Sequence, residues 1–248
     1  MTSPERAAVV SGGASGIGLA AAKCLAARGR TVALLDRDPA ALHQAIELLG
    51  GAGMKAVTAH EVDVTDGAAL DSAVCEIENV YGISTLINAA GILQLGTIDD
   101  VSVSDWDRMI DVNLKGVFLT CKTVMPMMVS AGGGAIVNVA SQSGRTKSTF
   151  SAPNYVAAKA GVIGLTMVLA NQAAVHGIRV NCVAPGLVET PMLSIYTAEQ
   201  RQSMIDAIPL GRFANAGEVA DVIAYLVSRQ SSYVTGQTIN VNGGSFMQ

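Results

Sequence analysis

The chain has 248 residues, of which 50% are hydrophobic and 15% are charged, and its formal net charge at pH 7 is −4. This composition suits one large apolar core, and the negative balance argues against nucleic acid as a partner. The four cysteines, Cys24, Cys75, Cys121 and Cys182, lie in apolar stretches without C-x-x-C spacing, so we expect buried thiols in a reducing compartment and no metal site.

Strand-like and helix-like runs alternate along the chain. The strand-like runs lie at residues 7–11, 31–36, 55–60, 84–88, 134–140, 178–183 and 237–241. This alternation is typical of a parallel sheet with helices on both faces, and it predicts an α/β fold with one doubly wound Rossmann domain of seven strands over residues 1–248. Residues 192–209 interrupt the alternation and would form either a short lid over a ligand or an ordinary surface helix.

A glycine-rich turn follows the first predicted strand and precedes a helical pattern at 17–28. Residues 11–18 read SGGASGIG, which has G-x-x-x-G-x-G spacing. Glycines let a backbone approach a pyrophosphate, and a helix N-terminus offers free N–H groups, although a plain tight turn would also explain the glycines. We expect a dinucleotide to bind at Gly12, Ser15, Gly16, Ile17 and Gly18.

Asp36 ends the second predicted strand, 18 residues beyond Gly18. This distance suits the carboxylate that accepts hydrogen bonds from the ribose hydroxyls of NAD, and the same charge would repel the 2′-phosphate of NADP. The neighbouring Arg37 argues the other way, because a guanidinium group can hold a phosphate. The balance predicts NAD as the cofactor.

Tyr155 and Lys159 lie four residues apart and share one face of a predicted helix. A phenol ordinarily has a pKa of about 10, and a nearby ammonium group favours the phenolate. The pair could therefore give and take a proton near neutral pH, although an amphipathic surface helix would also place these residues together.

In their order along the chain, these motifs resemble those of the short-chain dehydrogenase/reductase family, and the resemblance extends from Ala7 to Gly244. Residues 11–18 are similar to the family's TGxxxGIG turn, with Ser11 in place of threonine. Residues 88–91 read NAAG where the family has NNAG, so one side-chain hydrogen bond that braces this loop is missing. The C-terminal half is further similar to 3-oxoacyl-acyl-carrier-protein reductases.

The resemblance implies a catalytic set of Asn113, Ser141, Tyr155 and Lys159. Tyr155 would be the acid/base, and Lys159 would lower its pKa and bind the nicotinamide ribose. Ser141 would bind the substrate oxygen, and Asn113 would hold a water molecule that links Lys159 to solvent.

The resemblance also implies further contacts to the cofactor and to the substrate. The additional cofactor contacts would be Asp63, Val64, Asn88, Ala90, Gly91, Pro185, Gly186, Val188 and Thr190. We expect the substrate pocket to contain Gln94, Ser143, Phe150 and Met192.

We therefore expect an NAD(H)-dependent oxidoreductase that interconverts a simple, cyclic or sugar secondary alcohol and its ketone. One alternative is a 3-oxoacyl-acyl-carrier-protein reductase. Residues 125–132 and 169–174 correspond to the stretches that dock the acidic carrier in those enzymes, and here they contain no Lys or Arg. The other alternative is a non-catalytic dinucleotide-binding regulator, which the intact catalytic set argues against.

The apolar, Met-rich helices predicted around residues 113–129 and 154–176 resemble those that pair relatives across a two-fold axis, so we expect a homotetramer, or failing that a dimer. The N-terminus has no apolar signal core, and no segment has about 18 uninterrupted apolar residues. We expect a cytoplasmic protein that has no membrane contact and acts on a small molecule.

Overall fold

A seven-stranded parallel sheet forms the centre of the computed structural model, which describes residues 6–52 and 57–247. The strands lie in the order β3-β2-β1-β4-β5-β6-β9. Their bounds are β1 Ala7–Ser11, β2 Val32–Asp36, β3 Val57–Glu61, β4 Ile83–Asn88, β5 Gly134–Val139, β6 Ile178–Pro185 and β9 Thr238–Val241. The predicted doubly wound fold is confirmed; residues 55 and 56 of the third predicted strand lie outside the described residues.

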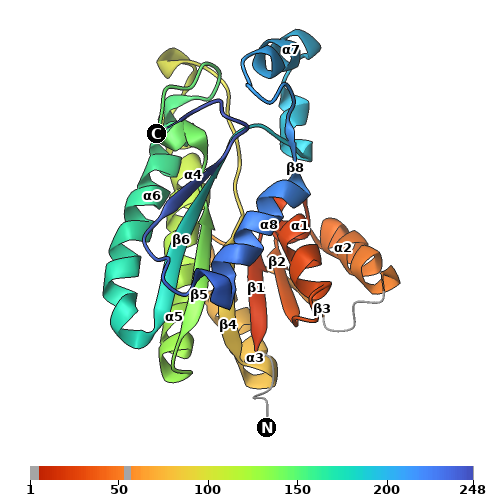
Figure 1. The fold of residues 1–248 in the computed structure, drawn as a ribbon, viewed down its shortest axis with the longest axis vertical. Helices are drawn as coiled ribbons and strands as arrows, with labels where there is room; N and C mark the ends of the chain where they lie inside the picture. Colours follow the sequence, from red (N-terminus) through yellow and green to blue (C-terminus); the bar gives the residue numbers. More distant parts are fainter. Residues whose placement is uncertain (1–5, 53–56, 248) are drawn as a thin grey trace.

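Helices cover both faces of this sheet (Figure 1). The helices are α1 Gly16–Ala26, α2 Pro39–Gly51, α3 Gly67–Tyr81, α4 Val103–Ile110, α5 Gly116–Ser130, α6 Pro153–Ala173, α7 Ala198–Asp206 and α8 Ala216–Val227. Alternate residues of β1 serve the two faces: Val9 packs in the core beneath α3, α5 and α6, and Val10 packs beneath α1, α2 and α8. A strand buried on both faces is continuously apolar, which is why these runs could be recognised in the sequence.

The chain reverses its direction of travel across the sheet between β1 and β4, which are neighbours. Ligands of open parallel sheets bind beside the carboxyl ends of the strands at such a reversal. The loops that follow β1 and β4 therefore define the edge at which a site is expected.

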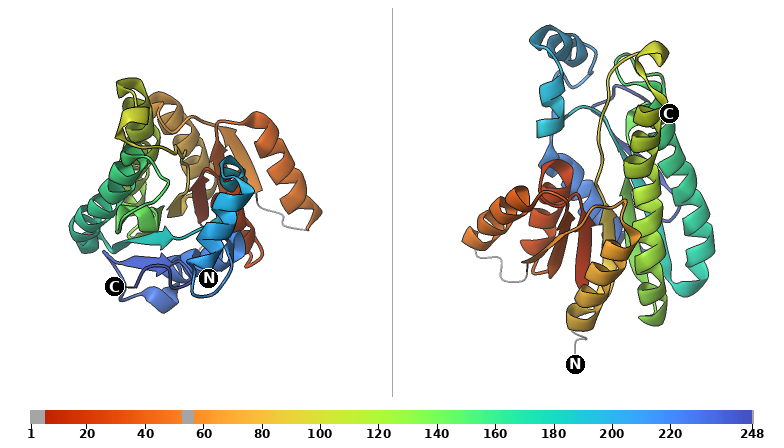
Figure 2. Two further views of the ribbon diagram at one scale, coloured as in Figure 1. Left: turned by 90° about the horizontal axis from the view of Figure 1, so that it is seen from above. Right: turned by 180° about the vertical axis from the view of Figure 1, so that it is seen from behind.

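A small projection rises above this edge (Figures 1 and 2). It contains a 3₁₀ helix, η5 Pro191–Ile195, then α7, and a two-stranded parallel ladder formed by β7 Val188–Glu189 and β8 Ala214–Asn215. Its own apolar cluster contains Leu193, Met204, Ile208 and Phe213. The two short strands were not predicted, because two residues carry no period-2 pattern.

The cysteine prediction is only half right. Cys121 and Cys182 are buried, whereas Cys24 is half-buried and Cys75 is exposed. Cys75 lies on the solvent side of the amphipathic helix α3, next to the buried Val74. Its apolar neighbours in sequence therefore face the core while the thiol faces water.

Residues Pro153–His176 form a helical segment that is long and apolar enough to cross a membrane by length and composition alone, although Lys159 and other polar residues interrupt its apolar sequence. Core helices of soluble proteins pass the same test, and here Val162, Thr166 and Ala170 of α6 are buried within the fold. Location in the cytoplasm stays a prediction.

A π-helix that was not predicted from the sequence lies between α4 and α5. This helix is η2 Asp111–Lys115, and the N–H group of Gly116 donates to the carbonyl oxygen of Asp111. Single π turns within helices are frequent at functional sites.

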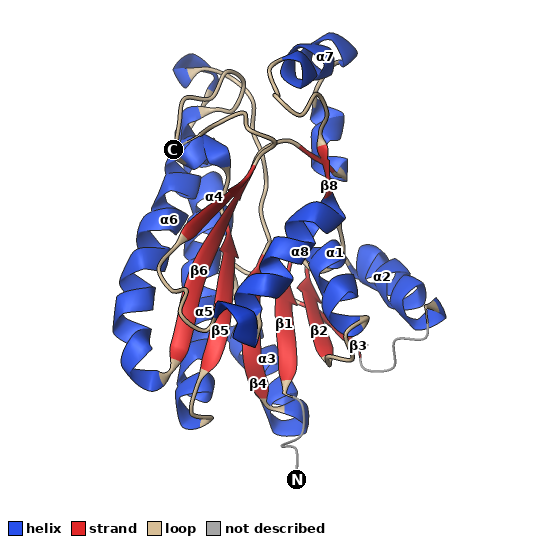
Figure 3. Cartoon of the chain, viewed as in Figure 1, coloured by secondary structure: helices blue, strands red, loops and turns tan. Residues whose placement is uncertain are grey.

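Figure 3 shows that a loop joins the end of β6 to the projection, and that the chain leaves the projection from β8 directly into α8. Binding residues are disproportionately found on such loops, held by a rigid scaffold.

Candidate active site

The loop between β1 and α1 lies against the loop that follows β4. A Cβ atom on Gly12 would lie only 2.6 Å from Cα of Ala90, and the φ angle of Gly12 is 66°. A Cβ atom on Gly18 would collide with the carbonyl oxygen of Gly12. The close approach of two backbones therefore explains why these two positions are glycine.

The start of α1 lies beside a cavity of about 210 Å³, which we call the loop cavity. Ser15 precedes the helix, and among the described residues its side chain makes no capping hydrogen bond. The first turn of α1 contains no acidic residue. A helix start with N–H groups and a hydroxyl available suits an anionic group such as a pyrophosphate.

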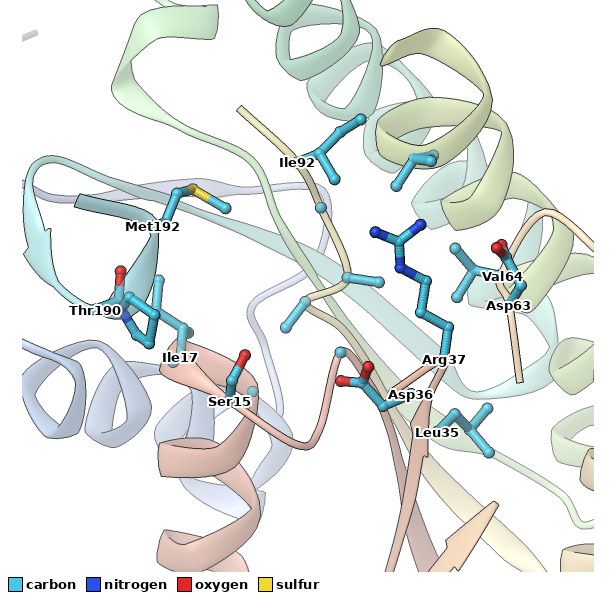
Figure 4. A pocket seen from close by; sticks show the side chains of 18 of the residues that line it. Ser15, Ile17, Leu35, Asp36, Arg37, Asp63, Val64, Ile92, Thr190 and Met192 are labelled. Carbon is cyan, nitrogen blue, oxygen red and sulfur yellow. The ribbon is translucent and has the colours of Figure 1, made fainter. Parts of the chain in front are cut away.

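Asp36 and Arg37 line the other side of the loop cavity from Ser15 and Thr190 (Figure 4). The half-buried carboxylate of Asp36 accepts hydrogen bonds from the backbone N–H groups of Ala14 and Asp38, each at 3.2 Å. These bonds hold the carboxylate at the cavity wall.

Asp63 lies near Arg37 in the same cavity. Its Oδ1 atom accepts hydrogen bonds from the backbone N–H (2.8 Å) and hydroxyl (2.7 Å) of Thr65. The backbone bond from Thr65 and, to a smaller extent, the hydroxyl and the charge of Arg37 hold the pKa of Asp63 below its usual value.

A second cavity of about 120 Å³ adjoins the first, and we call it the tyrosine cavity. Ser141, Tyr155 and Lys159 line it. Ile17 and Thr190 line both cavities, so a molecule in the loop cavity would lie close to these three side chains.

Asn154 fixes the start of α6 and thereby the position of Tyr155. Its amide donates to the side chain of Gln94 at 2.7 Å and to the carbonyl oxygen of Asp105 at 3.2 Å. Its own Oδ1 atom accepts from the N–H group of Tyr155 at 2.8 Å. Lys159 follows one turn later on the same helix face.

A short 3₁₀ helix, η3 Gln142–Gly144, positions Ser141 opposite the tyrosine. The hydroxyl of Ser141 accepts a hydrogen bond from the N–H group of Ser143 at 3.1 Å, and Ser141 lines the same cavity as Tyr155. A Cβ atom on Gly144 would lie 2.7 Å from the backbone of Lys159, so only glycine allows η3 to pack so closely against α6.

Burial controls the protonation of Tyr155 and Lys159. It raises the pKa of Tyr155 to about 12, and the hydrogen bond to Ser141 opposes this only in part. Burial also lowers the pKa of Lys159 to about 8. The ammonium group of Lys159 donates a hydrogen bond to the carbonyl oxygen of Val139 at 3.0 Å. That Lys159 lowers the pKa of Tyr155 stays a prediction.

Asn113 lies in η2 and is fully buried. Its amide donates to the carbonyl oxygens of Ile92 (3.1 Å) and Met109 (3.2 Å), and its Oδ1 atom accepts from the N–H group of Ile92 at 3.3 Å. The side chain therefore ties η2 to the loop after β4. The role of Asn113 in holding a water molecule stays a prediction.

The structure divides most of the predicted site residues between the two cavities. The predicted residues that line the loop cavity are Gly12, Ser15, Gly16, Ile17, Gly18, Asp36, Arg37, Asp63, Val64, Ala90, Gly91, Thr190 and Met192. Those that line the tyrosine cavity are Ile17, Ser141, Ser143, Tyr155, Lys159, Pro185, Gly186, Val188, Thr190 and Met192.

Four predicted residues line neither cavity: Asn88, Gln94, Asn113 and Phe150. The amide of Asn88 is buried and bonds to Asn138 at 2.8 Å, so its side chain joins strands rather than facing a ligand. Gln94 supports Asn154, as described above. Phe150 lies behind the tyrosine cavity, edge-on to Tyr196, with the ring centroids 6.1 Å apart.

Sequence reasoning missed several residues of the tyrosine cavity, among them Gln142, Leu187 and Tyr196. Gln142 directly follows Ser141, and this adjacency was a usable signal. Tyr196 lies in the projection, far along the chain from Tyr155, and nothing local to it indicates that it returns to this wall.

Comparisons with known proteins agree with this arrangement. Residues 12–245 match the sequence profile of a family described as enoyl-(acyl carrier protein) reductase. The chain is 39% identical over 249 residues to the (3R)-3-hydroxyacyl-CoA dehydrogenase of Mus musculus, a match that covers 97% of this chain and 96% of that protein. The chain belongs to the short-chain dehydrogenase/reductase family.

Other members of the short-chain dehydrogenase/reductase family are equally similar. The 3-oxoacyl-[acyl-carrier-protein] reductase of Thermotoga maritima is 41% identical over 237 residues, which covers 95% of this chain and 96% of that protein. A crystal structure of a 3-oxoacyl-[acyl-carrier protein] reductase from Brucella melitensis with bound NAD has a TM-score of 0.92 and 36% identity, and the match covers 98% of this chain and 92% of that one.

Proposed function

We propose that this short-chain dehydrogenase/reductase is an NAD(H)-dependent ketoreductase that interconverts a ketone and its secondary alcohol. The observation that supports it best is that Ser141, Tyr155 and Lys159 line one cavity, which adjoins the loop cavity. An alcohol carbon gives up hydride only as its O–H proton leaves, so a proton acceptor and a hydride acceptor must lie side by side.

In this proposal each residue has a separate task. Tyr155 exchanges a proton with the substrate oxygen, and Ser141 donates a hydrogen bond that stabilises charge developing on that oxygen. Bound NAD⁺ would supply the hydride acceptor, and its positive charge would favour the phenolate that burial alone disfavours. Lys159 adds a second positive charge beneath the ring, 5.8 Å from its centroid.

Cofactor preference follows from Asp36. Its carboxylate is held at the wall of the loop cavity and suits the two ribose hydroxyls of NAD, while the 2′-phosphate of NADP would meet a like charge. The relative solved with bound NAD supports this choice.

The substrate we propose is a small ketone, and the 3-oxoacyl compounds named for several relatives are the first class to test. Docking of an acidic carrier protein has less support, because residues 125–132 and 169–174 carry no basic side chain.

A spectrophotometric screen tests the proposal. Purified protein is assayed at 340 nm with NADH or NADPH and a panel of 3-oxoacyl-CoA thioesters, cyclic ketones and keto sugars, and in reverse with NAD⁺ and alcohols. We expect turnover of at least one class, with NADH preferred over NADPH by about tenfold or more in kcat/KM, which is about 1.4 kcal/mol. Replacing Asp36→Ala should narrow that ratio. The proposal would be contradicted if no substrate class is turned over, or if kcat/KM with NADPH equals or exceeds kcat/KM with NADH.

A further inference from the structure

A third cavity of about 340 Å³ lies behind the tyrosine cavity, between the loop after β5 and helix α7. We call it the lysine cavity. Both segments rise above the ligand-binding edge of the sheet in Figure 1. The lysine and tyrosine cavities share the lining residues Gln142, Ser143, Ser151, Leu187 and Tyr196. A substrate held at Tyr155 could therefore extend a substituent past these residues.

The lysine cavity has two chemically distinct sides. Phe150, Leu187, Met204 and Ile208 supply apolar surface. The polar side carries hydroxyl groups of serine and threonine residues at 143, 146, 148, 149, 203 and 245. A short aliphatic chain that ends in a hydrogen-bond acceptor would satisfy both sides.

Lys147 gives the lysine cavity its charge. Among the described residues that line it, Lys147 is the only lysine, and there is no Arg, His, Asp or Glu. Its side chain belongs to an exposed residue, and it takes part in none of the ion pairs found among the described residues. An ammonium group without a carboxylate partner, at a cavity whose lining also carries hydroxyl groups, favours an anion.

Gln142 lines both the tyrosine cavity and the lysine cavity. Its Oε1 atom accepts a hydrogen bond from the hydroxyl of Ser245 at 2.7 Å, which leaves the amide N–H groups as the polar atoms for the cavities on either side. A donor at this position would hold an oxygen lying between the reacting carbon and the anionic end.

We propose that the substrate carries an anionic group, on a short chain attached to the reacting ketone or alcohol, and that Lys147 binds this group in the lysine cavity. The inference rests on the proposed function for the identity of the reacting group, but the anion site itself depends only on the cavity and its charge.

Matched pairs of ketones that differ only in charge test the proposal. NADH-dependent reduction is measured for 3-oxobutanoate, 4-oxopentanoate, 5-oxohexanoate and 6-oxoheptanoate, each beside its methyl ester, and for dihydroxyacetone phosphate beside dihydroxyacetone. For at least one pair we expect kcat/KM to be about tenfold or more higher for the anion. The carboxylate and phosphate arms identify which anion is preferred.

Variants assign the effect to Lys147. Lys147→Gln should remove the preference by raising KM for the anion, while kcat/KM for the neutral partner stays within about twofold. Lys147→Arg should retain most of the preference. Lys122→Gln is the matched control, because Lys122 is an exposed lysine on α5 that packs over Phe118 and lines none of these cavities.

Two results would overturn the proposal. The first is an equal kcat/KM for every anion and its neutral partner. The second is an equal fall in kcat/KM for the anion and for its neutral partner in Lys147→Gln. If no ketone is turned over at all, the proposed function fails separately. Isothermal titration calorimetry of the same acids with the unmodified protein and with Lys147→Gln then decides, since Lys147-dependent binding supports the anion site and its absence refutes it.

Discussion

The side chains of Tyr155 and Lys159 are both buried, and burial disfavours the charged form of each side chain. Burial raises the pKa of Tyr155 to about 12 and lowers the pKa of Lys159 to about 8. Two groups this close titrate as a pair, so the first proton to leave belongs to the pair rather than to either residue. We therefore expect the pair to lose its first proton near pH 8, in the range where a dehydrogenase could use it.

This titration predicts the pH dependence of activity. Alcohol oxidation requires the base form of the pair, so kcat/KM for an alcohol should rise with pH through about 8, and ketone reduction should fall over the same range. In Lys159→Met the phenol titrates alone, and the rise should move upward by more than about one pH unit. The check is a pH profile of kcat/KM for both enzymes; an unmoved profile would show that Lys159 does not control the base.

Removing the hydroxyl of Tyr155 tests the acid/base role directly. Tyr155→Phe keeps the buried ring and deletes only the hydroxyl group at the tyrosine cavity. We expect kcat to fall by about a thousandfold, while the affinity for NADH stays within about threefold. Steady-state kinetics and a fluorescence titration of NADH measure the two effects. Near-normal turnover by this variant would refute the role.

The packing of η3 against α6 sets the distance between Ser141 and Tyr155. Only about 2.7 Å would separate a Cβ atom on Gly144 from the backbone of Lys159, and helix backbone cannot give way as a flexible side chain can. A single methyl group at this position must therefore move η3, and Ser141 with it.

Gly144→Ala should lower kcat by about tenfold or more and reduce the free energy of unfolding by about 1–3 kcal/mol. Gly50→Ala on α2 is the control, because a Cβ atom there meets nothing within 4 Å and α2 is outside the helices assigned to the interface. The control should keep full activity and be as stable as the parent or up to about 1 kcal/mol more stable, since alanine favours helix over glycine. Steady-state kinetics and thermal unfolding of both variants measure these effects. If the two variants have the same kcat and the same stability, η3 accommodates the added methyl group and the prediction is wrong.

The surface of the whole molecule retains apolar side chains on α5 and on α6 with the residues that follow it. Phe118 is 44% exposed, Met167 is 54% exposed and Val168 is 53% exposed. Exposed apolar side chains on helices commonly mark an interface between copies of a chain. Assembly into a homotetramer through these helices stays our prediction.

Light scattering at micromolar concentration should give the mass of four chains, and the double substitution Met167→Glu with Val168→Glu should reduce it. Placing charges in an apolar interface removes burial and adds a desolvation cost, so dissociation is the expected result. Val80→Glu is the control, because Val80 is 69% exposed on α3, outside these helices. A monomeric parent protein would contradict the prediction. If Val80→Glu also dissociates, the added charge and not its position in the interface causes the dissociation.

Most of the fold could be predicted from the sequence because its signals are local. Strands buried on both faces are continuous apolar runs, and the glycines of the first loop are required by a positive φ at Gly12 and by contact at Gly18. The two-residue strands β7 and β8 and the π-helix η2 carry no such local signal. Cys75 was misplaced because its neighbours are apolar while its own helix face is exposed.

By itself, the sequence determined how the main strands and helices follow one another along the chain. It also determined the position of the glycine loop and the placement of Tyr155 and Lys159 on one helix face. Each of these features depends on residues close together in the chain. The tertiary structure alone decided which of these groups lose contact with water. The raised pKa of Tyr155, the strand-joining role of Asn88 and the position of Lys147 at a cavity wall depend on contacts between distant segments. Desolvation and packing are properties of those contacts, and a local pattern does not encode them.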